Sequence, residues 1–198
     1  MPVPHVPARR PDVQVSKFVV AGGFGVGKTT LIGAVSEIEP LRTEEVLTQA
    51  GARTDSLDGV AGKTTTTVTM DFGRITFPGT RPSEVLLFGT PGQARFMPFW
   101  DHLVAGAHGA VVLVDTRRLE DSFHAVGYFE HSGIPFVVAA NVFDGAARYP
   151  EDDVARALRL PPGIPVISCD ARSEDSAAGV LIDLVRHADS LALTASAV

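Results

Sequence analysis

The sequence contains little cysteine, no excess of basic residues and no long hydrophobic run. Cys169 is the single cysteine among 198 residues, so the chain has no disulfide framework and fits a reducing cytoplasm. Its 17 Lys and Arg against 23 Asp and Glu give a formal net charge of -6, which argues against a nucleic-acid partner. No apolar run approaches the roughly 18 residues that span a bilayer. We therefore expect a soluble, cytoplasmic protein without a transmembrane segment, whose route to a membrane is through a partner.

The composition is otherwise that of an ordinary globular protein. Hydrophobic residues make up 45% of the chain and charged residues 20%, and this length is enough for one substantial core. Residues 1–12 are rich in proline and lack hydrophobic periodicity. We expect residues 1–12 to form a flexible N-terminal tail and residues 13–198 to form one domain.

One stretch organises the chain, the sequence GGFGVGKT at 22–29, which lies between apolar segments at 18–21 and 31–35. A buried strand, a glycine-rich turn and the start of a helix are the context of the phosphate-binding loop G-x-x-x-x-G-K-[ST]. Its glycines let backbone N–H groups turn inward on phosphates, and the helix N-terminus adds a positive dipole end. We expect Lys28 to reach the β- and γ-phosphates and Thr29 to offer its hydroxyl to Mg²⁺. The predicted phosphate-binding residues of this stretch are Gly22, Gly23, Phe24, Gly25, Val26, Gly27, Lys28, Thr29 and Thr30.

Short apolar stretches alternate with helical patterns along the rest of the chain. Strands are expected at about 13–21, 67–72, 85–88, 110–114, 135–140 and 165–168, and helices at about 28–38, 99–104, 119–131, 151–160 and 173–193. This order predicts an α/β fold with three αβα layers and a mostly parallel six-stranded sheet, with 67–72 as an antiparallel edge strand. Residues 41–64 are polar and aperiodic, which predicts a long functional loop. Phe123, Val126 and Phe129 are expected on the buried face of their helix.

A polar box follows the strand at 135–140, where residues 141–144 read N-V-F-D. In this position Asp144 would accept hydrogen bonds from both N1–H and the N2 amine of guanine, a pairing that adenine does not offer. Asn141 would tie the base to the phosphate loop. The simpler interpretation is a turn, because Asn and Asp are common after a strand.

The last predicted strand ends in a second box, SCDAR at 168–172. The backbone N–H of Ala171 would face the guanine carbonyl, with Asp170 and Arg172 on either side of the ring. Asp170 could instead cap the last helix, and the two roles are compatible.

Together these boxes resemble those of the Ras-like small GTPases, whose G domain is a P-loop NTPase fold. More narrowly, the chain resembles the bacterial GTPases of the actinobacterial conservon operons, relatives of the gliding-motility GTPase that works with Roadblock-type partners. The resemblance covers about residues 13–193. It is based on the segments GGFGVGKTT, KTTTTVTMDFG, LLFGTPGQ, VLVDTRR, NVFDG and CDAR.

The resemblance implies roles for two further loops. Thr67 aligns with the switch threonine that binds Mg²⁺ and the γ-phosphate, because MDFG follows it at the family's spacing. Thr65 and Thr66 are the alternatives if the alignment slips. Gly92 would offer its N–H to the γ-phosphate, and Gln93 matches the glutamine that orients the attacking water. The implied catalytic residues are therefore Gln93, Lys28 and Thr67, and the implied Mg²⁺ ligands are Thr29 and Thr67.

Three positions depart from the family pattern. Gly89 stands where most relatives have the aspartate that holds Mg²⁺ through a water, which predicts weaker Mg²⁺ binding and faster nucleotide exchange. Phe24 replaces a small residue beside the γ-phosphate and would obstruct an arginine finger from a partner, which predicts slow hydrolysis. Val142 replaces a lysine that packs over the nucleotide, which lowers the expected affinity and leaves ATP use open.

The sequence thus favours a GTP/GDP switch that needs Mg²⁺ and hydrolyses GTP slowly. The resemblance implies a Roadblock-type regulatory protein as first partner and a sensor-kinase-like protein as a further one. The alternative is a nucleotide-binding scaffold with little or no hydrolysis, which Gly89 and Phe24 favour and Gln93 opposes. A P-loop kinase would need an arginine-rich lid segment, and the sequence shows none.

Overall fold

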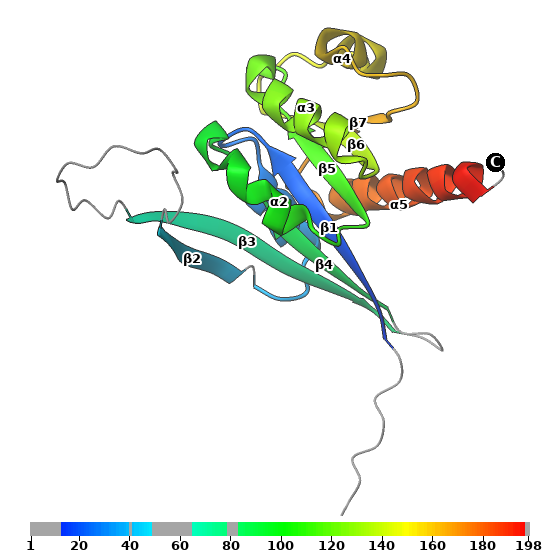
Figure 1. Ribbon diagram of the computed structural model, residues 1–198. Helices are drawn as coiled ribbons and strands as arrows, with labels where there is room; N and C mark the ends of the chain where they lie inside the picture. Colours follow the sequence, from blue (N-terminus) through cyan, green and yellow to red (C-terminus); the bar gives the residue numbers. More distant parts are fainter. Residues whose placement is uncertain (1–12, 40, 49–64, 79–82, 197–198) are drawn as a thin grey trace, which may run out of the picture.

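The computed structural model describes residues 13–39, 41–48, 65–78 and 83–196, and the predicted tail at 1–12 lies outside this description. Strands and helices alternate along the described chain (Figure 1). The strands are β1 Gln14–Gly22, β2 Leu41–Thr48, β3 Thr65–Phe77, β4 Ser83–Gly89, β5 Gly109–Val114, β6 Phe136–Asn141 and β7 Val166–Cys169. The helices are α1 Lys28–Val35, α2 Trp100–Val104, α3 Phe123–Ser132, α4 Glu151–Leu158 and α5 Glu174–Ser196, with 3₁₀ helices η1 Ala94–Phe99 and η2 Leu119–Ser122.

The strands form one seven-stranded sheet in the order β2-β3-β4-β1-β5-β6-β7. β1 lies at its centre and pairs in parallel with β4 and β5. β3 is antiparallel to both of its neighbours. The strand order reverses at β1, and ligands of such sheets bind outside the carboxyl ends of the strands at this point. The fold therefore places the segment after β1 at the expected ligand site.

Two hydrophobic clusters cover the two faces of the sheet, as expected for a three-layer αβα protein. Phe18 and Val20 of β1 face α1 and α5, whereas Val19 and Ala21 face α2, α3 and α4. This alternation follows from the two-residue period of a strand. Because both faces of β1 are covered, its sequence is a continuous apolar run. The sheet is therefore buried on both faces at β1, and the strand that carries the phosphate loop is held rigidly.

The predicted fold class is confirmed, a mostly parallel α/β sheet with one antiparallel strand. Residues 41–48 are not loop, however, but form the additional strand β2, which pairs along its whole length with β3. The antiparallel strand is therefore second from the edge. The sequence LRTEEVLT shows no alternation of apolar and polar residues, which is why this strand was not predicted.

A predicted core residue of α3 is exposed. Phe129 is buried at 1% exposure and packs against Trp100, Tyr128 and Phe136. Phe123 was expected on the same face but is 45% exposed. It is the first residue of α3, which follows η2 at the surface of the protein.

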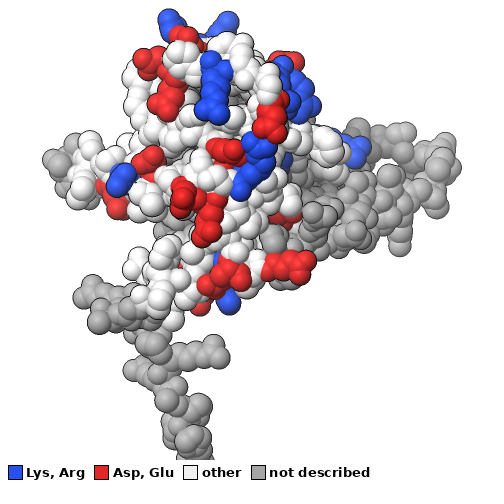
Figure 2. Space-filling model, turned by 180° about the vertical axis from the view of Figure 1, so that it is seen from behind, with Lys and Arg blue, Asp and Glu red and all other residues white. Residues whose placement is uncertain are grey.

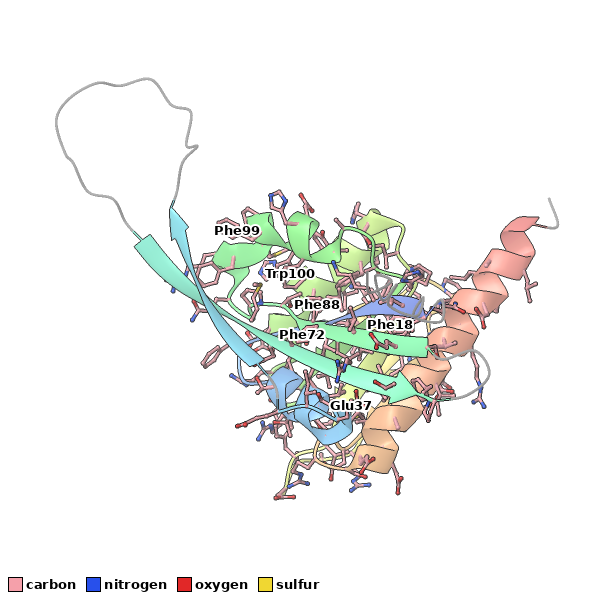
Figure 3. The ribbon with its side chains drawn as sticks, turned by 90° about the horizontal axis from the view of Figure 1, so that it is seen from below. Phe18, Glu37, Phe72, Phe88, Phe99 and Trp100 are labelled. Carbon is pink, nitrogen blue, oxygen red and sulfur yellow. The ribbon has the colours of Figure 1, made fainter. Side chains whose placement is uncertain are left out.

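The face of the sheet next to α2 also carries an aromatic pair at the β3–β4 step. Phe72 and Phe88 are cross-strand partners whose ring centroids lie 5.1 Å apart (Figure 3). On the α1 side, the Glu37 carboxylate accepts hydrogen bonds from Arg74 and Thr76 of β3. These contacts fix β3 against β4 and α1. Among the described residues, no helix is long and apolar enough to cross a membrane.

Candidate nucleotide-binding site

The phosphate loop connects the carboxyl end of β1 to α1, as its sequence predicts. Gly22 has φ 138°, and a Cβ there would lie 2.3 Å from the carbonyl oxygen of Leu113. Gly27 caps α1 with φ 108°, and a Cβ there would lie 2.7 Å from Nδ2 of Asn141. Both positions require glycine because of backbone conformation and close approach. The loop is therefore packed between β5 and β6, and the α1 N-terminus faces its interior.

Lys28 is the first residue of α1 and is buried at 9% exposure. Its Nζ donates hydrogen bonds to the carbonyl oxygens of Gly22 at 3.0 Å and Gly23 at 2.8 Å. Burial lowers the pKa of Lys28 to about 8, and the negative charge of Asp71 opposes this shift. The ammonium thus lies inside the loop in surroundings that favour an anionic ligand.

Thr29 contacts a carboxylate from another strand. Its Oγ1 donates a hydrogen bond of 2.5 Å to Oδ2 of Asp71. Asp71 lies in β3 directly opposite Gly89 of β4. A hydroxyl and a carboxylate are hard oxygen ligands, which suit Mg²⁺. The Thr29 hydroxyl and the Asp71 carboxylate fit a Mg²⁺ ion that takes its other ligands from nucleotide phosphates. Among the described residues, no cluster of three or more His, Cys, Asp and Glu could hold a metal.

A cavity of about 370 Å³ lies beside the phosphate loop. It is lined by Phe24, Gly25, Gly27, Lys28, Thr29, Thr30, Asp71, Thr90, Pro91 and Gly92. Gly92, the predicted γ-phosphate contact, lies against the loop, since a Cβ there would be 2.6 Å from Nζ of Lys28. Gln93 follows it with an exposed side chain, and its carbonyl accepts the N–H of Phe96 at the start of η1. The loop after β4 therefore closes one wall of the cavity.

Thr67 was expected in a switch loop, but its backbone lies within β3, paired with Val46 of β2. It lies four positions before Asp71, about 13 Å along an extended strand. Figure 1 shows this end of β2 and β3 extending away from the rest of the sheet. The side chain of Thr67, like those of Thr65 and Thr66, lies outside the described residues, so the predicted contact of Thr67 with Mg²⁺ stays a prediction.

Asn141 joins the two halves of the site. Its Nδ2 donates to the carbonyl oxygen of Val26 in the phosphate loop at 2.8 Å. Its Oδ1 accepts the backbone N–H of Ala171 at 3.0 Å. The Ala171 N–H, expected to face a guanine carbonyl, is therefore engaged with Asn141. The amide side chain holds the phosphate loop, the end of β6 and the segment after β7 in one fixed arrangement.

Asp144 is exposed and forms a bidentate pair with Arg172, at 2.9 and 3.1 Å. Arg172 also donates twice to Asp170, at 2.9 Å each. Hydrogen bonding from Arg172 holds the pKa of Asp144 below its usual value and lowers that of Asp170 to about 2. Both carboxylates are therefore ionised acceptors at neutral pH. The predicted base-binding residues are thus gathered at one edge of the sheet, and Arg172 bridges the carboxylates.

Sequence reasoning missed two residues of this site. Asp71 was treated only as part of a spacing pattern, although an acidic side chain in the middle of a strand is an unusual signal. Arg118 lies beside the phosphate loop, where it donates a hydrogen bond of 3.3 Å to the carbonyl oxygen of Phe24. Asp115 and Asp121 hold its guanidinium. Arg118 is the last residue of the segment VLVDTRR, but the sequence assigned it no role, because its contact with the loop joins residues 94 positions apart.

The Phe24 side chain, at the apex of the phosphate loop, is 68% exposed at the mouth of the cavity. Arg95 of η1 lies over the ring of Phe96.

On the face seen in Figure 2, acidic and basic side chains are interspersed, and neither sign covers a continuous area. The expectation that nucleic acid is not a partner stays a prediction.

Comparison with known proteins agrees with this geometry. No curated protein matches the chain. The G domain of the FeoB iron transporter of T. maritima is similar in structure, with a TM-score of 0.60 and 17% identity over 88% of this chain and 99% of that one. At this identity the similarity shows the fold, that of a G-domain P-loop NTPase. The model of a family described as conserved hypothetical ATP binding protein matches residues 20–190, and the chain belongs to this family.

Proposed function

We propose that the protein binds guanine nucleotides and acts as a GTP/GDP switch with slow, Mg²⁺-dependent hydrolysis. The observation that carries this proposal is the position of Asn141, which links the phosphate loop at Val26 to the segment after β7 at Ala171. One side chain thereby contacts both the phosphate loop and the candidate base site. An ionised carboxylate, Asp144, lies three residues after Asn141, where it matches the two donors on the guanine edge.

Base binding requires Arg172 to change partners. Arg172 occupies the same carboxylate edge of Asp144 that guanine would use. Its two hydrogen bonds to Asp170 can persist when it leaves Asp144. Asp170 would then hold the guanidinium beside the ring, where the planar group can stack on a base. This exchange favours a base with two adjacent donors, since only such a base replaces both lost hydrogen bonds.

The chemistry supported by the site is attack of water on the γ-phosphate. Lys28 and the loop amides neutralise the charge that develops on the phosphate oxygens. Mg²⁺, when bound with the nucleotide at Thr29, supplies Lewis-acid stabilisation of the same charge. Gln93 would orient the water from the loop that closes the cavity. Phe24, at the mouth of the cavity, leaves little room for an arginine finger from a partner, so we expect the intrinsic rate to be low.

The proposed output is a change in partner binding, as the resemblance to the conservon GTPases implies. GTP would order the loops next to the cavity and hydrolysis would release them. A Roadblock-type protein is the proposed first partner and a sensor-kinase-like protein a further one. The alternative is a nucleotide-binding scaffold, which is favoured by the exposed Phe24 ring at the mouth of the cavity.

Binding and turnover of GTP and ATP by the purified protein with Mg²⁺ test the proposal. Selective binding of a non-hydrolysable GTP analogue, with slow release of phosphate from GTP, is the expected result. Tight GTP binding without turnover, even with a Roadblock-type protein added, would favour the scaffold. Preference for ATP, the nucleotide in the family's description, would overturn the assignment of Asp144 to guanine.

Replacing Gln93 by alanine is expected to slow GTP turnover by up to about 10²-fold, because a misplaced nucleophile costs this much. The affinity for the GTP analogue should be unchanged, since the Gln93 side chain is exposed and is assigned only to the water. Single-turnover phosphate release measures the rate and a fluorescent analogue measures the affinity. Gln14→Ala, at the exposed amino end of β1, is the matched control. An unchanged rate for Gln93→Ala would remove Gln93 from the mechanism.

A further inference from the structure

The site contains a carboxylate whose position explains the glycine at the end of β4. Gly89 occupies the position at which the resemblance predicts an aspartate, and it is buried. The β3–β4 register places Asp71 directly opposite Gly89. A Cβ on Gly89 would lie 3.1 Å from Cβ of Asp71, 3.1 Å from Cδ1 of Ile32 and 3.3 Å from Oδ2 of Asp71. The side chains of Asp71 and Ile32 therefore occupy the space next to residue 89.

The contacts of Asp71 are with the phosphate loop. Its Oδ2 accepts the 2.5 Å hydrogen bond from Thr29, its charge acts on Lys28, and it lines the cavity beside the loop. A half-buried carboxylate that served only sheet stability would have no reason to lie opposite a glycine and face an ammonium and a threonine hydroxyl. A small residue suits position 89 because Asp71 and Ile32 occupy the neighbouring space.

We propose that Asp71 is the carboxylate of the Mg²⁺ site in this protein, supplied by the neighbouring strand β3 instead of the end of β4. This inference rests on the proposed nucleotide binding and specifies how the metal is held. It also replaces the expectation, drawn from Gly89 alone, that Mg²⁺ binding is weak. Asp71 orients the Thr29 hydroxyl and adds the negative charge that a Mg²⁺–phosphate site requires.

The test is the Mg²⁺ dependence of the release of a fluorescent GDP analogue. Asp71→Asn keeps the size of the side chain but removes the charge. It should raise the Mg²⁺ concentration needed for half-maximal retention by about 10–100-fold. Release in excess chelator should be as fast as in the wild type. Equal Mg²⁺ dependence of Asp71→Asn and wild type would overturn the inference, and so would a loss of affinity that is the same with and without Mg²⁺, since that indicates a structural role.

A double variant tests the position of the carboxylate independently of single-variant stability. Asp71→Gly combined with Gly89→Asp returns the carboxylate to β4, and the glycine opposite removes the close contact between the two Cβ atoms. We expect it to recover most of the wild-type Mg²⁺ dependence, whereas Asp71→Gly alone should not. Asp183→Asn, on α5, is the matched control and should behave as wild type. If the wild type binds no nucleotide at all, both the proposed function and this inference fail; if it binds nucleotide and only the Asp71 results disagree, the inference alone fails.

Discussion

Replacing Lys28 by alanine is expected to lower the affinity for GTP by about 10³-fold, because truncating one member of a buried, hydrogen-bonded charge pair costs about 4 kcal/mol. Two of the three ammonium donors are used by the carbonyl oxygens of Gly22 and Gly23. These contacts aim the third donor and the charge at the interior of the loop, where a phosphate would bind. Titration with a fluorescent GTP analogue measures the change.

The same substitution should not unfold the protein. The pKa of Lys28 is lowered to about 8 in the folded chain, so between about pH 8 and 10.5 the unfolded chain binds more protons. Stability of the nucleotide-free protein therefore rises with pH across this window, and charged Lys28 costs stability below it. Lys28→Ala should melt at or above the wild-type temperature. Lys17→Ala is the control for binding, since Nζ of Lys17 contacts Ala105 and the ring of Phe88. Unchanged GTP affinity in Lys28→Ala would contradict the phosphate-loop assignment.

Lys28 also makes GTP binding depend on pH. Phosphate oxygens stabilise the ammonium, so its pKa must rise above about 8 when nucleotide binds. Binding at pH 9 should therefore take up close to one proton, and the affinity should fall about tenfold per pH unit above pH 8 until the bound-state pKa is reached. Calorimetry in buffers of different ionisation enthalpy measures the proton uptake. Lys28→Arg, whose guanidinium stays charged, should lose this dependence.

The parts of the fold that the sequence predicted are those encoded locally. The strand at 14–22, the phosphate loop and the start of α1 need only a run of apolar residues, spaced glycines and a helical pattern. The carboxyl ends of β6 and β7 converge because parallel strands align them, so the order of the boxes along the chain was enough to predict that Asn141 and Ala171 lie together.

The parts that could not be predicted depend on register between distant strands. The sequence of β2 has no hydrophobic pattern typical of a strand, and β2 forms only by pairing with β3. The role of Asp71 depends on which residue of β4 lies opposite, and no spacing within either strand encodes that. The Arg172–Asp144 pair joins residues 28 positions apart, through loops whose conformations are set by packing. The sequence therefore predicted most of the residues of the site, but not the hydrogen bonds and ion pairs between them.

Asp144→Asn is expected to shift base preference from guanine to xanthine, with a change of about 10³-fold or more in the ratio of the two affinities. Guanine presents two donors, N1–H and the N2 amine, to the Asp144 carboxylate. An asparagine amide has one acceptor and one donor group, so its N–H₂ would face the N2 amine without a partner. Xanthine has a carbonyl at that position, and the same amide then pairs with both groups. Sites that hydrogen-bond a ligand edge discriminate by about 10⁴–10⁵ when a buried partner is lost, and the exposure of Asp144 lowers this figure.

Competition between fluorescent GDP and unlabelled GTP, XTP or ATP measures this change. Wild type should prefer GTP, and Asp144→Asn should prefer XTP while its binding of inorganic pyrophosphate is unchanged, because the phosphate loop is intact. Asp189→Asn, an exposed position on α5, controls for the loss of one negative charge. Asp144→Asn also removes the ion pair with Arg172. Arg172→Ala is the control for this loss, because it removes the same ion pair but keeps the Asp144 carboxylate that accepts from guanine.

If Asp144→Asn still prefers GTP, the N-V-F-D box does not recognise the base. The hydrogen bonds of Asn141 to the phosphate loop and to Ala171 would then serve only to stabilise these loops.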